Sequence, residues 1–202
     1  LFPYTTLFRS RTMANSSADQ EKQPQRPAQS QPPPGDEAKL RPQPRSSRPG
    51  YVGSGKLRDR VALITGGDSG IGRATAILFA REGAEVAIVY LSEDADAEET
   101  ARRVEQEGRS CLRIRGDVGR DEFCRAAVQQ VVDRFGRLDV LVNNAGGQFP
   151  APAQHISANG FAAVVKNNLL GTWNVTREVA NQAMIPRKRG CIVNVIANIY
   201  RG

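Results

Sequence analysis

The sequence has few of the residues from which metal centres and disulfide scaffolds are built. Its 202 residues include a single histidine, His155, and three cysteines, Cys111, Cys124 and Cys191. The cysteines lie far apart, are odd in number and lack metal-ligand spacing, so we interpret them as free thiols in a reducing compartment. We therefore expect no metal site and a cytoplasmic location.

Long hydrophobic segments are also missing. No apolar run reaches the roughly 18 residues that a membrane-spanning helix needs. The opening decapeptide, LFPYTTLFRS, is too short and too polar for the core of a signal peptide. These observations predict a protein without a membrane partner.

The globular part lacks an excess of basic charge. The formal net charge is +7, but residues 1–60 hold eleven Lys or Arg against five Asp or Glu, whereas residues 61–202 hold seventeen against sixteen. A nucleic-acid-binding domain would carry its basic residues on the fold. The charge distribution therefore argues against a nucleic-acid partner.

The N-terminal part of the chain, up to Gly55, has little that could form a core. Nine of the twelve prolines lie in the first fifty residues, among Gln, Ser and Arg, and such a composition cannot offset the entropy of ordering. Residues 1–10 resemble the in-frame translation of a short-read sequencing adaptor, and we exclude them from the fold. We predict a disordered tail over residues 11–55 and one globular domain over residues 56–202.

From residue 60 onward, short apolar runs alternate with segments of helical period. Strands that alternate with helices in this way predict a parallel sheet covered on both faces. The fold class is therefore α/β, a doubly wound sheet of the Rossmann type with about five strands. The expected strands are 60–66, 85–91, 111–118, 138–146 and 191–197, and the expected helices are 70–83, 94–108, 120–136 and 157–185.

A glycine-rich segment, TGGDSGIG at residues 65–72, joins the first expected strand to the first expected helix. By itself such a run is often only a tight turn. Between a strand and a helix, however, glycines let the backbone approach a pyrophosphate, and the helix N-terminus supplies N–H donors. This segment predicts a dinucleotide-binding loop.

Four motifs in order resemble the short-chain dehydrogenase/reductase superfamily, over residues 58–200. They are the Gly-x-x-x-Gly-x-Gly spacing at 66–72, GDV at 116–118, NNAG at 143–146 and Asn-x-x-Gly at 168–171. The resemblance implies an NAD(P)-dependent oxidoreductase that transfers hydride between nicotinamide and a carbonyl, alcohol or enoyl substrate. It also implies the strand order 3-2-1-4-5, a small-molecule substrate and a homo-oligomer.

The resemblance assigns roles to individual residues. Asn168 would be the catalytic asparagine, which holds the active-site lysine through a water. Asn144 has a second reading of equal weight, as a clamp between neighbouring strands. The cofactor-binding residues would be Gly66, Ser69, Gly70, Ile71 and Gly72 at the phosphates, Asp117 and Val118 at the adenine, and Asn144, Ala145 and Gly146 at the ribose and nicotinamide.

The residue that selects between NAD and NADP is not the usual one. An NAD enzyme places Asp or Glu at the end of the second strand, where this sequence has Tyr90. The missing carboxylate removes repulsion against a 2′-phosphate, although no Arg is evident to bind one and Glu93 could still reach the ribose. NADP and NAD both remain open, with NADP favoured.

The sequence departs from the family where the proton-transfer groups belong. The family uses Tyr-x-x-x-Lys, in which the lysine lowers the pKa of the tyrosine, and a serine just past the fifth strand. Here Ala197 takes the serine position, and the lysine paired with Tyr200 would fall at position 204, beyond the last residue. We expect a C-terminally truncated fragment that binds cofactor without catalysis, and the alternative is a non-catalytic dinucleotide-binding or sensing protein.

The two parts of the domain resemble different branches of the family. Residues 20–142 resemble the bacterial stress-associated branch that includes glucose and ribitol dehydrogenase-like proteins. Residues 143–202 resemble the branch near peroxisomal trans-2-enoyl-CoA reductase. A chimera of two related genes, joined near LDVLVNNAG at 138–146, is one explanation of this pattern.

Overall fold

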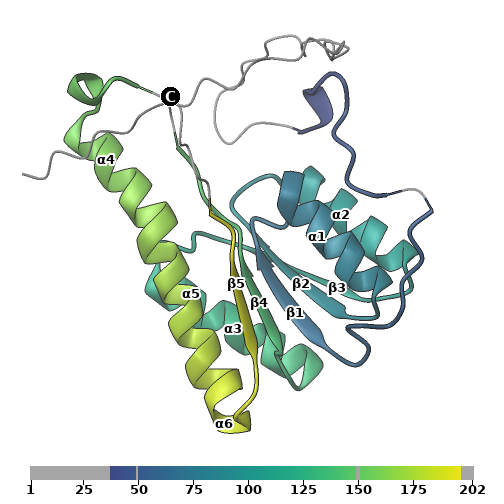
Figure 1. The fold of residues 1–202 in the computed structure, drawn as a ribbon. Helices are drawn as coiled ribbons and strands as arrows, with labels where there is room; N and C mark the ends of the chain where they lie inside the picture. The colour runs from purple at the N-terminus through teal and green to yellow at the C-terminus, as the bar shows by residue number, and fades with distance from the viewer. Residues whose placement is uncertain (1–36, 49, 149–150, 197–202) are drawn as a thin grey trace, which may run out of the picture.

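The computed structural model describes residues 37–48, 50–148 and 151–196 and shows a five-stranded parallel sheet with helices on both faces (Figure 1). The strand order is β3-β2-β1-β4-β5, as the resemblance implied. The strands are β1 (Val61–Thr65), β2 (Glu85–Tyr90), β3 (Cys111–Arg115), β4 (Val140–Asn143) and β5 (Cys191–Asn194). The predicted Rossmann-type sheet of about five strands is thus confirmed.

The helices α1 (Gly70–Arg81) and α2 (Asp94–Gln106) cover one face of the sheet, and α3 (Asp121–Phe135) and α5 (Gly171–Val179) cover the other (Figure 1). Alternate residues of β1 serve the two faces, because side chains along a strand point to opposite sides. Ala62 and Ile64 pack with α1 and α2, whereas Val61 and Leu63 pack with α3 and α5. The sheet is therefore the middle layer of two separate cores.

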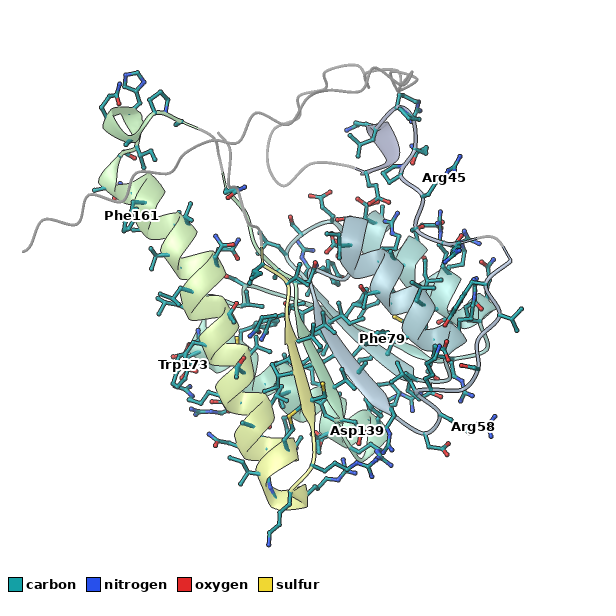
Figure 2. The ribbon with its side chains drawn as sticks, viewed as in Figure 1. Arg45, Arg58, Phe79, Asp139, Phe161 and Trp173 are labelled. Atoms are coloured by element: carbon teal, nitrogen blue, oxygen red, sulfur yellow. The ribbon has the colours of Figure 1, made fainter. Side chains whose placement is uncertain are left out.

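The expected helix over 157–185 is one long helical stretch containing two wider turns. It comprises α4 (Ala158–Val165), the π-helical segment η3 (Lys166–Leu170), α5, the π-helical segment η4 (Ala180–Met184) and α6 (Ile185–Arg187). Ser157 caps its start by accepting a hydrogen bond from the Gly160 N–H. Phe161 and Trp173 point away from the sheet (Figure 2) and are 65% and 57% exposed.

Part of the expected N-terminal tail lies against the fold. A short 3-10 helix, η1 (Glu37–Lys39), sits at the same edge of the sheet as the N-terminal ends of α1 and α2 (Figure 1). Glu37 and Ser46 are buried. The boundary at residue 56 stays a prediction, and residues 1–36, Ala197 and Tyr200 lie outside the described residues.

Within the described ranges, no helix has the length and apolar character needed to cross a membrane. The same ranges contain no cluster of three or more His, Cys, Asp or Glu side chains arranged to hold a metal ion.

Candidate functional site

The loop between β1 and α1 is held in a tight conformation that only glycine allows at two points. Gly66 has a φ of +62°, and its N–H donates to the Val89 carbonyl at 2.7 Å. A Cβ added to Gly72 would lie 1.9 Å from the Gly66 carbonyl oxygen. The first turn of α1 therefore packs directly onto the loop, and a side chain at position 72 would separate them.

The N-terminus of α1 has free donors and open space beside it. Among the residues that the structure describes, the N–H groups of Ile71 and Gly72 have no hydrogen-bond acceptor, as is usual for the first turn of a helix. Gly70 has a φ of +51°, and a Cβ placed on it would meet nothing within 4 Å. Ser69 is the N-cap but makes no side-chain cap bond. This end of α1 can accept an anionic ligand, since unpaired N–H groups and the helix dipole both favour negative charge.

Asn144 joins the end of β4 to the end of β1. Its Nδ2 donates to the carbonyl oxygens of Gly66 at 2.9 Å and Thr65 at 3.1 Å. The Thr65 hydroxyl in turn accepts from the backbone N–H groups of Asn144 and Ala145, at 3.0 and 2.9 Å. These contacts are those of the inter-strand clamp, and they place Ala145 and Gly146 beside the glycine loop.

Asn168 lies in the π-helical turn η3 and contacts the segment that follows β4. Its Oδ1 accepts from the Gly147 N–H at 3.1 Å, and its Nδ2 donates to the Gly147 carbonyl at 2.8 Å and to the Val164 carbonyl at 3.0 Å. A Cβ on Gly146 would lie 2.5 Å from Asn168 Oδ1. The structure thus brings Asn168 to Gly146. π-helical turns are frequent at functional sites.

Asp117, at the end of β3, is already engaged by neighbours. Its two carboxylate oxygens accept from the Gly119 N–H and from Lys166 Nζ, both at 2.8 Å. Burial opposes ionisation here, but the hydrogen bonds from Lys166 and Gly119 hold the pKa of Asp117 below its usual value. Val118 is only 6% exposed and packs in the core with α3 and α5. At the predicted adenine position, therefore, Asp117 is accessible and the Val118 side chain is largely covered.

Tyr90 ends β2 with its ring buried and its hydroxyl at the start of α2. The hydroxyl donates to Asp94 Oδ1 at 2.8 Å, and Arg115 Nη1 donates to Asp94 Oδ2 at 2.9 Å. Burial, and next the hydrogen bond to Asp94, raise the pKa of the Tyr90 phenol. Beside the end of β2, the Asp94 carboxylate and the Arg115 guanidinium therefore form an ion pair, and each side chain is 58% exposed.

All the predicted site residues follow the carboxyl ends of β1 to β4 or lie on η3 above them. The direct contacts join the glycine loop to Asn144 and join Gly146 to Asn168, beside the point between β1 and β4 where the strand order reverses. In open α/β sheets, ligands bind at this switch point. The structure therefore brings the predicted residues to one edge of the sheet, the edge at the carboxyl ends of its strands.

Sequence reasoning missed four residues in this region: Glu37, Asp94, Arg115 and Lys166. Asp94 and Arg115 could have been found, because both follow strand ends that must be neighbours in this topology. Lys166 lies two residues before the predicted Asn168. No sequence pattern pointed to Glu37 as a site residue, since it lies in a segment whose composition predicts disorder.

A hollow of about 500 Å³ lies elsewhere, near the C-terminal end of α1, lined by residues that include Arg48, Tyr51, Phe79 and Glu82. Glu82 accepts hydrogen bonds there from the Tyr51 hydroxyl and from the backbone N–H groups of Ser54 and Lys56. These bonds, that of Tyr51 first, lower the pKa of Glu82 to about 2. The carboxylate of Glu82 is therefore satisfied within the chain, and the hollow lies at the opposite end of α1 from the glycine loop.

Comparison with known proteins finds a match between residues 60–200 and the family described as short chain dehydrogenase. The chain is 46% identical over 176 residues to the "Uncharacterized oxidoreductase YhdF" of Bacillus subtilis (strain 168), covering 87% of this chain and 60% of that protein. It is 49% identical over 146 residues to "General stress protein 39" of the same organism, covering 72% of this chain and 51% of that protein. It is 36% identical over 177 residues to the "Glucose and ribitol dehydrogenase" of Daucus carota, covering 84% and 60%.

Solved structures show the same fold. The "citronellol catabolism dehydrogenase (AtuB)" of Pseudomonas aeruginosa PAO1 superposes with a TM-score of 0.68 at 35% identity, over 74% of this chain and 62% of that one. An NAD+-bound xylitol dehydrogenase superposes with a TM-score of 0.66 at 35% identity, over 69% and 53%. The resemblance to the stress-associated and glucose/ribitol branch is thereby confirmed. The alignment to YhdF covers 176 of the 202 residues, so it must extend across residue 143, where the second resemblance was expected to begin. The chain spans about 60% of the length of that relative.

Proposed function

The chain belongs to the short chain dehydrogenase family, and we propose that it is part of an NAD(P)-dependent oxidoreductase that transfers hydride between nicotinamide and a carbonyl, alcohol or enoyl substrate. One observation carries the proposal. The N-terminus of α1, where the N–H groups of Ile71 and Gly72 lack an acceptor within the described residues, meets Asn144, and the segment after Asn144 meets Asn168, at the switch point of the sheet. An anion-binding helix end at this place is typical of dinucleotide sites.

The residues present fit such a cofactor. The N–H groups of Ile71 and Gly72 would hold the pyrophosphate, and the absence of a side chain at Gly70 would let it approach the backbone. Asp117 would border the adenine, and the segment from Asn144 to Gly146 would line the nicotinamide side. A bound dinucleotide would supply the hydride carrier, which no amino-acid side chain can provide.

The chain's own residues would orient this carrier and the substrate. Asn144 fixes the ends of β1 and β4 to each other, so the glycine loop and the segment after β4 keep a constant separation. Asn168, anchored to Gly147 by two hydrogen bonds, fixes the π-helical turn beside Gly146. Pre-organised groups of this kind contribute to catalysis because their positions need not change during the reaction.

NADP is the favoured cofactor. The end of β2 carries Tyr90 in place of a carboxylate, and the Arg115 guanidinium lies beside it, where it could bind a 2′-phosphate. Asp94 works against NADP binding because its carboxylate already pairs with the Arg115 guanidinium. The Arg115→Ala substitution should therefore weaken NADPH binding more than NADH binding, as measured by fluorescence titration.

The relatives suggest alcohols and their carbonyl products as the substrate class. The names of the similar proteins refer to glucose and ribitol, xylitol and citronellol, all of which carry hydroxyl groups. The enoyl alternative rests on the resemblance of residues 143–202 alone.

The decisive experiment compares two glycine substitutions in a dinucleotide titration. Gly70 and Gly136 both have positive φ, +51° and +71°, and both have open space where a Cβ would lie. Valine should strain the backbone similarly at either position, but only Gly70 lies at the proposed phosphate site. Gly70→Val should abolish NADPH and NADH binding, and Gly136→Val, at the C-terminal end of α3, should retain it. Equal affinities in the two variants would contradict the proposal.

A second candidate is a dinucleotide-binding protein without turnover. It is favoured by one position of the sequence, where Ala197 takes the place of the family's usual serine. NAD(P)H oxidation measured with aldehyde, ketone and enoyl-thioester substrates separates the two. Cofactor binding without turnover would support this candidate for residues 1–202, whereas turnover that survives Tyr200→Phe would show that another residue transfers the proton.

A further inference from the structure

The segment 37–48 places a carboxylate at the N-terminus of α1. Glu37 Oε2 accepts a hydrogen bond from the Gly70 N–H at 2.5 Å, and Glu37 Oε1 forms an ion pair with Arg73. The Glu37 backbone N–H donates to Asp96 Oδ2 at 3.3 Å, and Glu37 is 7% exposed. A negative group thus already occupies the end of the helix that the proposed function assigns to the pyrophosphate.

The charges around this contact disfavour a second anion while Glu37 is in place. One guanidinium, that of Arg73, faces the carboxylates of both Glu37 and Asp96. Arg73 also donates to the Asp68 carbonyl, and it is 4% exposed. A pyrophosphate arriving beside Glu37 would add negative charge to a buried cluster that already has two carboxylates for one cation.

We propose that residues 37–48 form an intramolecular strap whose Glu37 carboxylate takes the place of the dinucleotide phosphate at Gly70, so that cofactor binding requires the strap to leave. This inference rests on the proposed function and deepens it, because it assigns a regulatory device to the same site. The strap is a competitor at effectively fixed concentration. It lowers the apparent affinity for the cofactor by the fraction of molecules in which the site is free.

The surrounding contacts allow Glu37 to leave without stranding a buried charge. Arg73 would keep Asp96 at 3.0 Å and the Asp68 carbonyl at 2.6 Å. A second anchor of the strap, the hydrogen bond from Arg103 to the Ser46 hydroxyl, is equally replaceable, because Arg103 also pairs with Glu99 at 2.6 Å. The fold can therefore persist with the strap released.

A purely structural role for Glu37 makes the opposite prediction. Ser69 provides no side-chain cap for α1, so Glu37 could serve as a cap contributed from a distant part of the chain. Removal of a cap would destabilise α1 and weaken dinucleotide binding. Removal of a competitor would strengthen it.

The test titrates the full chain, residues 1–202, with NADPH and NADH by fluorescence and follows thermal unfolding in parallel. Glu37→Ala should lower Kd by about tenfold or more, as expected for a strap that occupies the site at least nine-tenths of the time. Glu37→Gln should lower it by a smaller factor, since the amide oxygen can still accept from Gly70. Ser46→Ala, which loosens the strap away from the site, should also lower Kd. The control Glu122→Ala removes an exposed acidic side chain from the first turn of α3 and should change nothing.

Unchanged or weaker binding in Glu37→Ala, with Ser46→Ala and Glu37→Gln unchanged, would overturn the strap. In that case, a weaker dinucleotide affinity in Gly70→Val than in Gly136→Val would still support the proposed function. If the folded Glu37→Ala and Ser46→Ala chains bind neither dinucleotide, the proposed function fails and the strap fails with it.

Discussion

The two strands β1 and β5 are similar in sequence and opposite in environment. Both are short, parallel and rich in apolar residues, VALIT and CIVN. Every residue of β1 is buried, whereas every residue of β5 is exposed, with Ile192 at 38% and Val193 at 42%. An apolar run therefore predicts that a strand forms, but its burial depends on what the rest of the fold places around it.

The neighbours of each strand explain the difference. β1 lies between β2 and β4 and is covered on both faces by helices. β5 pairs with β4, and within the described ranges no second strand lies along its other edge. The same residue types should consequently contribute very differently to stability in the two strands.

The largest effect is expected in β1. Leu63 is fully buried, and Leu63→Ala should cost about 3 to 4 kcal/mol, because the substitution removes buried methyl groups and leaves a cavity. Urea unfolding followed by circular dichroism measures the change. A loss no greater than that of the matched β5 variant, Ile192→Ala, would erase the distinction between the strands.

The next effect concerns Asp139, which connects the two strands at their amino ends (Figure 2). Its carboxylate accepts from the Val61 N–H at 3.0 Å and pairs with Arg137 at 2.6 Å, and its carbonyl accepts from the Cys191 N–H at 2.9 Å. Asp139→Asn should cost about 2 to 3 kcal/mol at neutral pH, since it removes a buried charged acceptor.

The same residue predicts a dependence on pH. Burial would raise the pKa of Asp139, but Arg137 and the Val61 N–H hold it below the usual value. The contribution of the Asp139 carboxylate to the free energy of unfolding is therefore fully present above the pKa of about 4 that it has in the unfolded chain. This contribution is lost as the pH falls through the lower pKa that Asp139 has in the folded protein. Unfolding measured between neutral pH and acid should be less pH-dependent in Asp139→Asn, and parallel curves for the two proteins would contradict this assignment.

A smaller effect is expected at the carboxyl end of β1. The buried Thr65 hydroxyl accepts from two backbone N–H groups, those of Asn144 and Ala145. Thr65→Val keeps the shape but leaves these donors unpaired, at a cost of about 1 to 2 kcal/mol. It should also weaken NADPH binding by loosening the segment beside the glycine loop. Thr65→Ser, which retains the acceptor, is the control, and binding equal to that of the valine variant would count against the role of the hydroxyl.

The smallest effect is expected in β5. Ile192→Ala should cost less than about 1 kcal/mol, because the side chain is already partly in water. Val193→Lys should cost little more and should reduce self-association, since charged residues discourage pairing at an exposed strand edge. Size-exclusion chromatography at increasing protein concentration tests this, and an unchanged elution profile would show that the edge does not associate.

The sequence was sufficient to predict the elements and the fold class, and the family resemblance added the strand order. Strand and helix periods are local properties. Three of the four motifs follow the end of a strand, so a known topology brings them to the same edge of the sheet. The sequence could not predict Glu37 at Gly70, because that contact joins residues 33 positions apart through a segment without periodicity. Nor could it predict the π-helical turn at Asn168, whose extra residue leaves no compositional trace.

The pairing of β1 with β4 also determines when the crevice can form during synthesis. Gly66 and Asn144, which lie on the two sides of the site, are 78 positions apart in the chain. At about 5 to 20 residues per second, the glycine loop would leave the ribosome roughly 4 to 16 s before the strand that completes the crevice. During that interval β1 can pair with β2, the next strand in the chain, with Val61 opposite Glu85. The other edge of β1 stays unpaired until β4 has been synthesised.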